Sequence, residues 1–278
     1  MKLAIITGGT SGLGLAYANC LAGKGWHLLI TGRNETRLLS AKVYLQKKYK
    51  VPVSAHKVDF NNENEFGCFI DRVKKLKRVD MLINNAGFGC RNGFVKEQFS
   101  THQKMLQVYI TAYTHLIHSI VPKMTEQGAG NIINVSSLSA FLPSPLNYFY
   151  CASKAFLISF SECLHVDLKD KGVKIQVLCP GFIKTNFHNR IKRGSVCDGL
   201  VGSLLWMSAD KVARLSLKSL KSSGVVVIPG LVNKFIYYLS RWIPRKAYYW
   251  AVYRSARYLD KPNETMQVVK EQRKMVYA

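Results

Sequence analysis

The chain has 278 residues, of which 48% are hydrophobic and 20% are charged. This balance is that of a folded globular protein and excludes an intrinsically disordered chain. Forty Lys and Arg against sixteen Asp and Glu give a formal net charge of +24, so we expect an anionic ligand or surface among its partners. The seven cysteines are scattered, without a C-x-x-C pair, which argues against a disulfide framework and against a zinc site.

The first residues run from a short apolar segment directly into glycines. This leaves no room for the charged and apolar regions of a secretory signal, so we expect a cytoplasmic protein. The longest uncharged stretches, 105–121 and 127–153, contain His, Gln, Ser, Asn and Pro. Neither stretch resembles a membrane span.

Short apolar segments alternate with helix-length segments through the first 230 residues. The expected strands are 3–7, 27–31, 53–58, 80–84, 131–136, 174–178 and 224–228. The expected helices are 12–24, 34–49, 61–77, 100–127, 148–171 and 209–222. This alternation predicts an α/β fold, a Rossmann-type doubly wound sheet of seven parallel strands. We expect residues 1–230 to form this domain and residues 231–278 to form a basic, aromatic, helical extension.

A glycine-rich loop, Gly8-Gly9-Thr10-Ser11-Gly12-Leu13-Gly14, joins the first strand to the first helix. Gly8 permits the tight turn, Gly12 lets the backbone approach a phosphate, and Gly14 permits close packing of the helix on the strand. At the first strand-to-helix turn of an alternating chain, this spacing predicts a dinucleotide site. An ordinary turn is the alternative.

The end of the second strand bears on which dinucleotide binds. An acidic residue at this place holds the ribose 2′-hydroxyl of NAD, whereas a 2′-phosphate needs a cation instead. The sequence has no acid here and carries Arg33. NADP(H) is therefore favoured over NAD, with a solvated arginine at a helix start as the alternative.

Tyr150 and Lys154 are four residues apart on an expected helix, so they share one face of it. A positive neighbour lowers the pKa of a phenol and makes it a usable general acid and base. Ser136 and Ser137 end an apolar strand, at the edge where open α/β sheets bind ligands. Because consecutive strand residues face opposite ways, only one of these serines is expected to face the ligand.

Together these motifs resemble the short-chain dehydrogenase/reductase family over residues 3–230. The resemblance rests on Thr7 to Gly14, on Asn84-Asn85-Ala86-Gly87, on Ser137, on Tyr150 with Lys154, and on Pro180-Gly181-Phe182-Ile183-Lys184-Thr185. Within the family, the segments around Ser137 and Tyr150 are similar to bacterial reductases of 3-oxoacyl or ketone substrates, or of broad or unassigned substrate.

The resemblance implies roles for these residues. Ser137 would polarise a substrate carbonyl, Tyr150 would donate a proton, and Lys154 would lower the pKa of Tyr150 and bind the nicotinamide ribose. The remaining NADP(H) contacts that it implies are Gly8, Thr10, Ser11, Gly12, Leu13, Gly14, Arg33, Asp59, Asn84, Ala86, Gly87, Pro180, Gly181, Ile183 and Thr185. Two of these have plainer alternatives, since Asp59 could cap the helix starting near 61 and Thr185 could be a surface loop residue.

One position departs from the family's pattern. The family usually has an Asn in the helix before the fifth strand, where it helps to hold a water in the proton relay to the lysine, and Tyr109 takes its place here. Either the relay is rebuilt with Tyr109 or Thr111, or turnover is reduced, or solvent reaches Lys154 directly. The first of these, with the phenol in the relay, is the favoured expectation.

The segment after Gly230 is basic and aromatic, with Leu231, Phe235, Leu239 and Trp242 at helical spacing. Such a helix could lie on an anionic membrane, which would make the protein peripheral to the inner face of the membrane. It could equally pack on the domain, extend the substrate pocket or form a subunit contact. No nucleic-acid-binding motif is present.

The sequence therefore predicts an oxidoreductase that transfers a hydride between NADP(H) and a hydrophobic carbonyl or alcohol substrate, with no metal. The expected pocket walls are residues 88–94, residues 182–205 and the tail. A dimer or tetramer is expected, with helices 105–121 and 148–171 at the subunit contact. The alternative is a catalytically weak nucleotide-binding sensor on the same fold.

Overall fold

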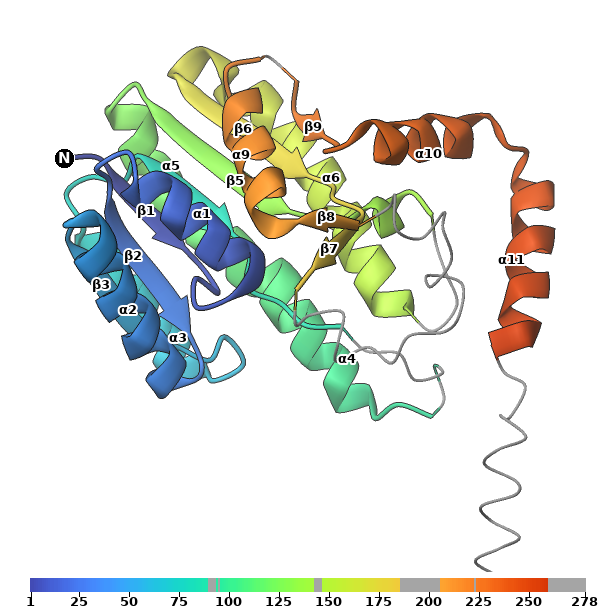
Figure 1. Cartoon of the computed structure of the whole chain (residues 1–278), viewed down its shortest axis with the longest axis horizontal. Helices are drawn as coiled ribbons and strands as arrows, with labels where there is room; N and C mark the ends of the chain where they lie inside the picture. Colours follow the sequence, from blue (N-terminus) through green and yellow to red (C-terminus); the bar gives the residue numbers. More distant parts are fainter. Residues whose placement is uncertain (90–93, 95, 143–146, 186–205, 223, 260–278) are drawn as a thin grey trace, which may run out of the picture. The chain divides into compact units, whose positions relative to one another are not determined.

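A computed structural model of the chain describes residues 1–89, 94, 96–142, 147–185, 206–222 and 224–259. It confirms the doubly wound parallel sheet, whose strand order is β3-β2-β1-β4-β5-β6-β9 (Figure 1). The strands are β1 (Leu3–Ile6), β2 (His27–Gly32), β3 (Val53–Lys57), β4 (Met81–Asn84), β5 (Gly130–Val135), β6 (Val173–Leu178) and β9 (Val226–Val227). All pairs in this sheet are parallel.

Helices cover both faces of the sheet. The first group is α1 (Gly12–Ala22), α2 (Glu35–Tyr49) and α9 (Ala209–Ser219). Its apolar side chains pack with Ala4, Ile6 and other strand residues that point to the same face of the sheet. The second group is α3 (Glu63–Lys75), α5 (Tyr113–Glu126) and α6 (Tyr148–Leu168), and it packs with Leu3 and Ile5, which face the opposite way. Because each strand is buried on both faces, its sequence is apolar almost throughout.

The long helix expected at 100–127 is divided. It consists of α4 (Phe99–Leu106), a π-helical turn η1 (Gln107–Ala112) and α5. A π-helical turn accommodates an extra residue in the helix and frequently marks a functional site. Tyr109 lies in the middle of this turn.

A second, small sheet was not predicted. Strands β7 (Phe182–Lys184) and β8 (Trp206–Ser208) pair in parallel. Two short 3-10 turns, η2 (Leu138–Ala140) and η3 (Lys169–Lys171), follow β5 and α6. Each strand of the small sheet has only three residues, too few to show a recognisable alternation in the sequence.

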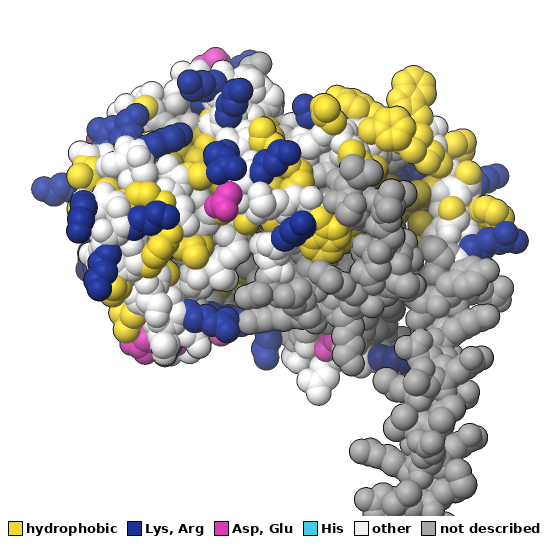
Figure 2. Space-filling view, viewed as in Figure 1, with side chains coloured by type: hydrophobic (Ala, Val, Ile, Leu, Met, Phe, Trp, Pro, Cys, Tyr) yellow, Lys and Arg dark blue, Asp and Glu magenta, His cyan; other side chains and the backbone are white. Residues whose placement is uncertain are grey.

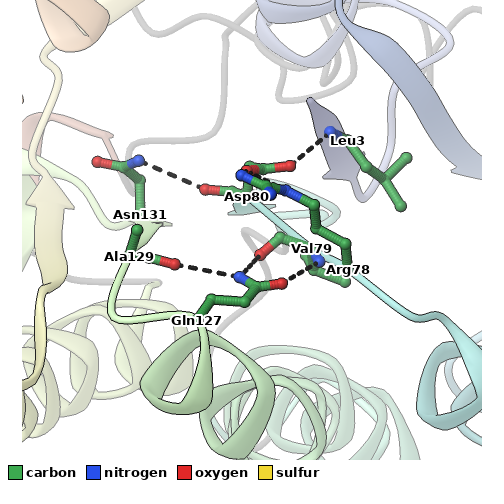
Figure 3. Close-up of polar contacts among 7 residues, drawn as sticks. All are labelled: Leu3, Arg78, Val79, Asp80, Gln127, Ala129 and Asn131. Carbon is green, nitrogen blue, oxygen red and sulfur yellow. Dashed lines mark hydrogen bonds and ion pairs between the residues drawn. The ribbon is translucent and has the colours of Figure 1, made fainter. Parts of the chain in front are cut away.

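Polar side chains close the amino edge of the large sheet (Figure 3). The Asp80 carboxylate accepts hydrogen bonds from the Leu3 backbone N–H at 2.8 Å and from the Arg78 guanidinium at 2.6 and 2.8 Å. The Gln127 amide, at the end of α5, donates to the carbonyl oxygens of Val79 and Ala129, both at 3.1 Å. These bonds connect the starts of β1, β4 and β5 to one another.

The C-terminal part contains two helices, α10 (Leu231–Trp242) and α11 (Arg245–Leu259), separated at Pro244. The chain divides into two compact units, Met1–Ser240 and Arg241–Ala278, and the domain boundary expected after residue 230 remains a prediction. Among the described residues, no helix combines the length and the apolar character that crossing a membrane requires.

Candidate active site

A cleft of about 370 Å³ lies at the carboxyl edge of the sheet, within the first unit. It opens where β1 and β4 lie side by side and the strand order reverses, which is where doubly wound folds bind dinucleotides. It is lined by the following predicted residues: Gly8, Thr10, Ser11, Gly12, Leu13, Arg33, Asp59, Ala86, Gly87, Ser137, Tyr150, Lys154, Pro180, Gly181, Ile183 and Thr185.

The glycine loop lies against the floor of this cleft. Gly8 and Gly12 have φ angles of +66° and +54°, a region that L side chains disfavour. Gly14 does not line the cleft; a Cβ there would come within 2.2 Å of the Gly8 carbonyl oxygen. Its absence of a side chain therefore lets α1 pack on the loop, as the spacing of the glycines predicts.

The amino end of α1 differs from those of α2, α3 and α9. Those three helices have a side-chain cap from Asn34, Asn62 and Ser208, respectively, and an acidic residue in the first turn. At α1, Ser11 makes no cap hydrogen bond, and the first turn has no acid. Backbone N–H groups with a partial positive charge thus face the cleft, an arrangement suited to a pyrophosphate.

Thr7 and Asn85 hold the two loops of the cleft together. The Thr7 hydroxyl oxygen accepts from the backbone N–H of Asn85 at 2.8 Å and of Ala86 at 3.0 Å, and the Asn85 amide donates to the carbonyl oxygens of Thr7 and Gly8. Asn84, a predicted contact, lies within the sheet instead and donates to the Asn134 side chain. Of the two neighbouring asparagines, Asn85 is the one that lines the cleft.

Two arginines lie at one end of the cleft. Arg33 follows β2, and Arg37 lies in the first turn of α2. Both are exposed, and neither makes an ion pair within the described residues. The sequence did not predict Arg37, which lines the same cleft as Arg33.

Asp59 lines the cleft after β3, but it does not cap α3. The cap is Asn62, whose side chain accepts from the Glu65 N–H at 3.1 Å. Asp59 accepts instead from the Asn61 N–H at 3.0 Å, and its own N–H donates to Glu65. The plainer alternative for Asp59 is therefore wrong, and its position beside an adenine remains a prediction.

Thr185 also has a specific place. Its methyl carbon is 3.2 Å from where a Cβ of Gly12 would be, so β7 leads the chain over the glycine loop. Thr185 is therefore a cleft residue in the described structure and not simply part of a surface loop.

The two serines after β5 have different partners. Ser136 is buried, and its hydroxyl donates to the Lys154 carbonyl oxygen at 2.8 Å. Ser137 hydrogen-bonds Tyr150 and accepts from the Ser139 hydroxyl at 2.8 Å. Both serines line the cleft, but Ser137 is the one that shares a hydrogen bond with the phenol.

Burial dominates the ionisation of the Tyr150 and Lys154 pair. It raises the pKa of Tyr150 to about 12, although the hydrogen bond with Ser137 lowers it. It also holds the pKa of Lys154 well below its usual range. The expected lowering of the phenol's pKa by a charged lysine is therefore wrong, because desolvation disfavours both charges.

Tyr109 has its hydroxyl turned away from the lysine. The hydroxyl donates to the Phe88 carbonyl oxygen at 2.7 Å, while the ring centroid is 3.7 Å from the Lys154 Nζ. Thr111 is exposed and does not line the cleft. The Tyr109 hydroxyl has a backbone partner and Thr111 lies outside the cleft, so this geometry does not favour the expected phenol relay, which stays a prediction.

Other lining residues were not predicted. They come mainly from the ends of β2, β3, β4 and β5, and they are Thr31, Gly32, Asn34, Arg37, Val58, Phe60, Asn61, Asn85, Val108 and Val135. Several are neighbours of predicted residues, so the rule that ligands bind at the carboxyl edge could have found them. Phe88 and Gly89, from the expected wall 88–94, and Tyr109 and Ser136, which the sequence had singled out, line the cleft as well. Of the expected pocket walls, residues 90–93 and 186–205 and the tail from residue 260 lie outside the described residues.

The fold and the cleft define a dinucleotide-binding oxidoreductase class. The family model described as short chain dehydrogenase matches residues 2–195, and the chain belongs to this family of oxidoreductases, as its motifs predict. Relatives include an uncharacterised oxidoreductase of Staphylococcus saprophyticus, 30% identical over 66% of this chain and 79% of its own length. Another is a very-long-chain 3-oxoacyl-CoA reductase of Rattus norvegicus, 29% identical over 86% of this chain and 76% of its own.

Solved structures share this fold. A short-chain dehydrogenase from Sphingobium yanoikuyae in complex with NADPH covers 95% of this chain and 97% of its own, with a TM-score of 0.76 and 25% identity. L-Sorbose reductase from Gluconobacter frateurii, complexed with NADPH and L-sorbose, covers 82% of this chain and 95% of its own, with a TM-score of 0.71 and 25% identity.

Proposed function

We propose that this protein uses NADPH to reduce the carbonyl group of a hydrophobic ketone or 3-oxoacyl compound to an alcohol. The observation that carries the proposal is the meeting of Ser137, Tyr150 and Lys154 in the same cleft as the glycine loop. A binding site alone does not require a serine hydrogen-bonded to a tyrosine beside a buried lysine.

The cleft suits a phosphorylated dinucleotide. The uncapped end of α1 matches a pyrophosphate. At the adenosine end, Arg33 and Arg37 match a 2′-phosphate, and the two residues directly after β2, Arg33 and Asn34, include no acid to hold a 2′-hydroxyl. The NADPH-bound neighbours support the same cofactor.

The chain's own residues have separable tasks. Bound NADPH supplies the hydride. Tyr150 is protonated at neutral pH because burial raises its pKa to about 12, so its phenol is in the form that donates a proton to the carbonyl oxygen. Ser137 hydrogen-bonds that phenol and orients it. Lys154 is buried behind it, with its Nζ donating to the Val135 carbonyl oxygen at 2.8 Å.

The test is NADPH oxidation with a panel of 3-oxoacyl thioesters, bulky ketones and aldehydes. We expect turnover with at least one apolar carbonyl class and a clear preference for NADPH over NADH. A wild-type protein that binds NADPH tightly but reduces none of the panel would favour the second candidate, a nucleotide-binding sensor. The observation behind that candidate is Tyr109 in place of the usual amide.

We also propose that α10 binds an anionic membrane surface. Its inner side packs on the domain through Asn233 and Tyr237, whereas Leu231, Phe235 and Leu239 lie outward and are 84%, 66% and 46% exposed. Figure 2 shows a continuous apolar area over this helix. The helix itself carries Lys234 and Arg241 and no acid, which matches anionic lipid headgroups.

Vesicle co-sedimentation tests this surface. We expect binding to vesicles containing phosphatidylserine, weak binding to pure phosphatidylcholine, and loss of binding in the double variant Leu231→Glu/Phe235→Glu. The matched control is Leu39→Glu/Val43→Glu, which changes exposed apolar residues on α2. If the α10 variant instead disrupts a dimer in light scattering, the helix is a subunit contact.

A homo-oligomer formed through the predicted helices is also proposed. On α6, Phe156 and Val166 are exposed apolar side chains, which suit a subunit contact. We expect a dimer or tetramer in light scattering and dissociation in Phe156→Glu/Val166→Glu. A monomer at micromolar wild-type concentration would contradict it.

A further inference from the structure

Lys154 is enclosed by aromatic rings. Its Nζ lies 3.7 Å from the Tyr109 ring centroid, 5.5 Å from that of Tyr150 and 6.0 Å from that of Tyr113. The side chain is only 3% exposed, and within the described part of the chain its Nζ donates a hydrogen bond to the Val135 carbonyl oxygen. The Tyr109 ring is thus the aromatic face in closest contact with the ammonium group.

The groups around the lysine offer no negative charge. Tyr109 and Tyr113 have pKa values well above the ordinary phenol value, mainly because of burial. Burial also raises the pKa of Tyr150 and of Cys179 to about 12. All four groups are neutral at neutral pH, so an ammonium here is stabilised only by the Val135 carbonyl and by the electron-rich face of an aromatic ring.

The surrounding backbone fixes the Tyr109 ring in this position. Its hydroxyl is anchored on the Phe88 carbonyl oxygen at 2.7 Å. Gly87 lies directly under the ring, because a Cβ there would come within 2.4 Å of it. The π-helical turn Gln107–Ala112 carries the residue. Three separate constraints thus hold the ring over Nζ.

We propose that Tyr109 is a positioning residue for Lys154, acting through its ring and not through its hydroxyl: the ring stabilises the ammonium by a cation–π contact and excludes water from it. This proposal rests on the proposed reductase function only for its consequence in catalysis. The aromatic face of Tyr109 then sets the charge of the lysine, and with it the pH dependence of reduction. The amide that the family usually has at this position would instead admit water to the lysine.

Direct titration of Lys154 tests the proposal without any substrate. Isotope-labelled lysine is followed by NMR as the pH rises, and the signal is assigned by its absence in Lys154→Met. We expect Tyr109→Phe to leave the pKa unchanged, because the ring remains. Tyr109→Leu should lower it further, because the cation–π contact is lost in an apolar space. Tyr109→Asn should raise it, because the amide and water solvate the ammonium.

The control is Tyr113→Leu, which removes a neighbouring buried ring that is farther from the Nζ and should move the pKa least. If the truncated variants do not fold, fluorinated phenylalanines at position 109 weaken the ring's negative face at nearly constant shape, and the pKa should fall with each fluorine. A shift in Tyr109→Phe as large as in Tyr109→Asn, or no response to fluorination, would overturn the proposal.

Catalysis provides the second readout. In the active enzyme, the alkaline limb of the kcat–pH profile should keep its position in Tyr109→Phe, with kcat within roughly two-fold of the wild type. In Tyr109→Asn the same limb should move to higher pH. A Tyr109→Phe variant that reduces substrate much more slowly than the wild type would show instead that the Tyr109 hydroxyl takes part in the proton relay. If the wild type reduces nothing, the reductase proposal fails, while the NMR titration still decides the role of the ring.

Discussion

The two edges of the large sheet use polar groups in opposite ways. At the amino edge, Asp80 bonds to Arg78 and to the Leu3 backbone, and Gln127 bonds to the backbone of Val79 and Ala129 (Figure 3). At the carboxyl edge, α1 begins without a side-chain cap, and Arg33 and Arg37 make no ion pair among the described residues. One edge satisfies its polar groups internally, and the other leaves them for a ligand.

This difference separates stability from function. A satisfied buried group contributes to the folded state, and removing its partner costs free energy of unfolding. A polar group without a partner in the protein contributes little to the free energy of unfolding until a ligand binds to it. Changes at the amino edge should therefore alter unfolding, and changes at the carboxyl edge should alter binding and turnover.

The largest expected effect is at the carboxyl edge. Tyr150→Phe should lower kcat/KM for carbonyl reduction by about a thousandfold, because the proton donor is lost. The Kd for NADPH and the Tm should stay close to wild type. Tyr148→Phe, on the exposed side of the same helix, is the control. Undiminished turnover in Tyr150→Phe would show that another group supplies the proton.

Arg33→Asp should raise the Kd for NADPH by about tenfold or more, because a charge-assisted contact with the 2′-phosphate is replaced by repulsion. Binding of NADH should change much less. The effect should shrink with added salt, because the arginine is exposed. Fluorescence titration measures both cofactors, with Arg72→Asp on α3 as the control. A wild type that prefers NADH would show that the cofactor assignment is wrong.

At the amino edge, Asp80→Asn should lower the free energy of unfolding by about 1–2 kcal/mol, because the charge-assisted bonds from Arg78 and Leu3 weaken. Denaturant titration gives the value, and kcat per folded molecule should not change. Asp167→Asn, an exposed site on α6, is the control. Lost activity with unchanged stability would contradict the separation of the two edges.

The smallest effect is a pH dependence confined to the amino edge. Burial raises the pKa of Asp80, but the hydrogen bonds from Arg78 and Leu3 outweigh it and leave the pKa below its usual value. The carboxylate therefore stabilises the fold above the unfolded-state pKa, and this contribution is lost as the pH falls through the folded-state pKa. The stability difference between wild type and Asp80→Asn should narrow on acidification; a difference that stays constant with pH would argue against it.

Sequence patterns predicted the parts of the molecule whose structure depends on residues close together in the sequence. The sheet follows from apolar runs, and the glycine loop follows from backbone constraints at Gly8, Gly12 and Gly14. The neighbours of Tyr109 could not be predicted in this way. Its hydroxyl bonds to Phe88, which is distant in sequence, and the π-helical turn around it contains no proline or glycine to signal it.

The close contact between Gly87 and Tyr109 also limits the order in which substitutions can accumulate. With the ring in place, a methyl group at Gly87 would come within 2.4 Å of it, a clash that a buried site cannot absorb cheaply. Replacing Tyr109 by a smaller residue would remove that obstacle. Gly87→Ala should therefore be damaging alone and tolerated after Tyr109→Asn, so the two positions are epistatic and an evolving chain must change the tyrosine first.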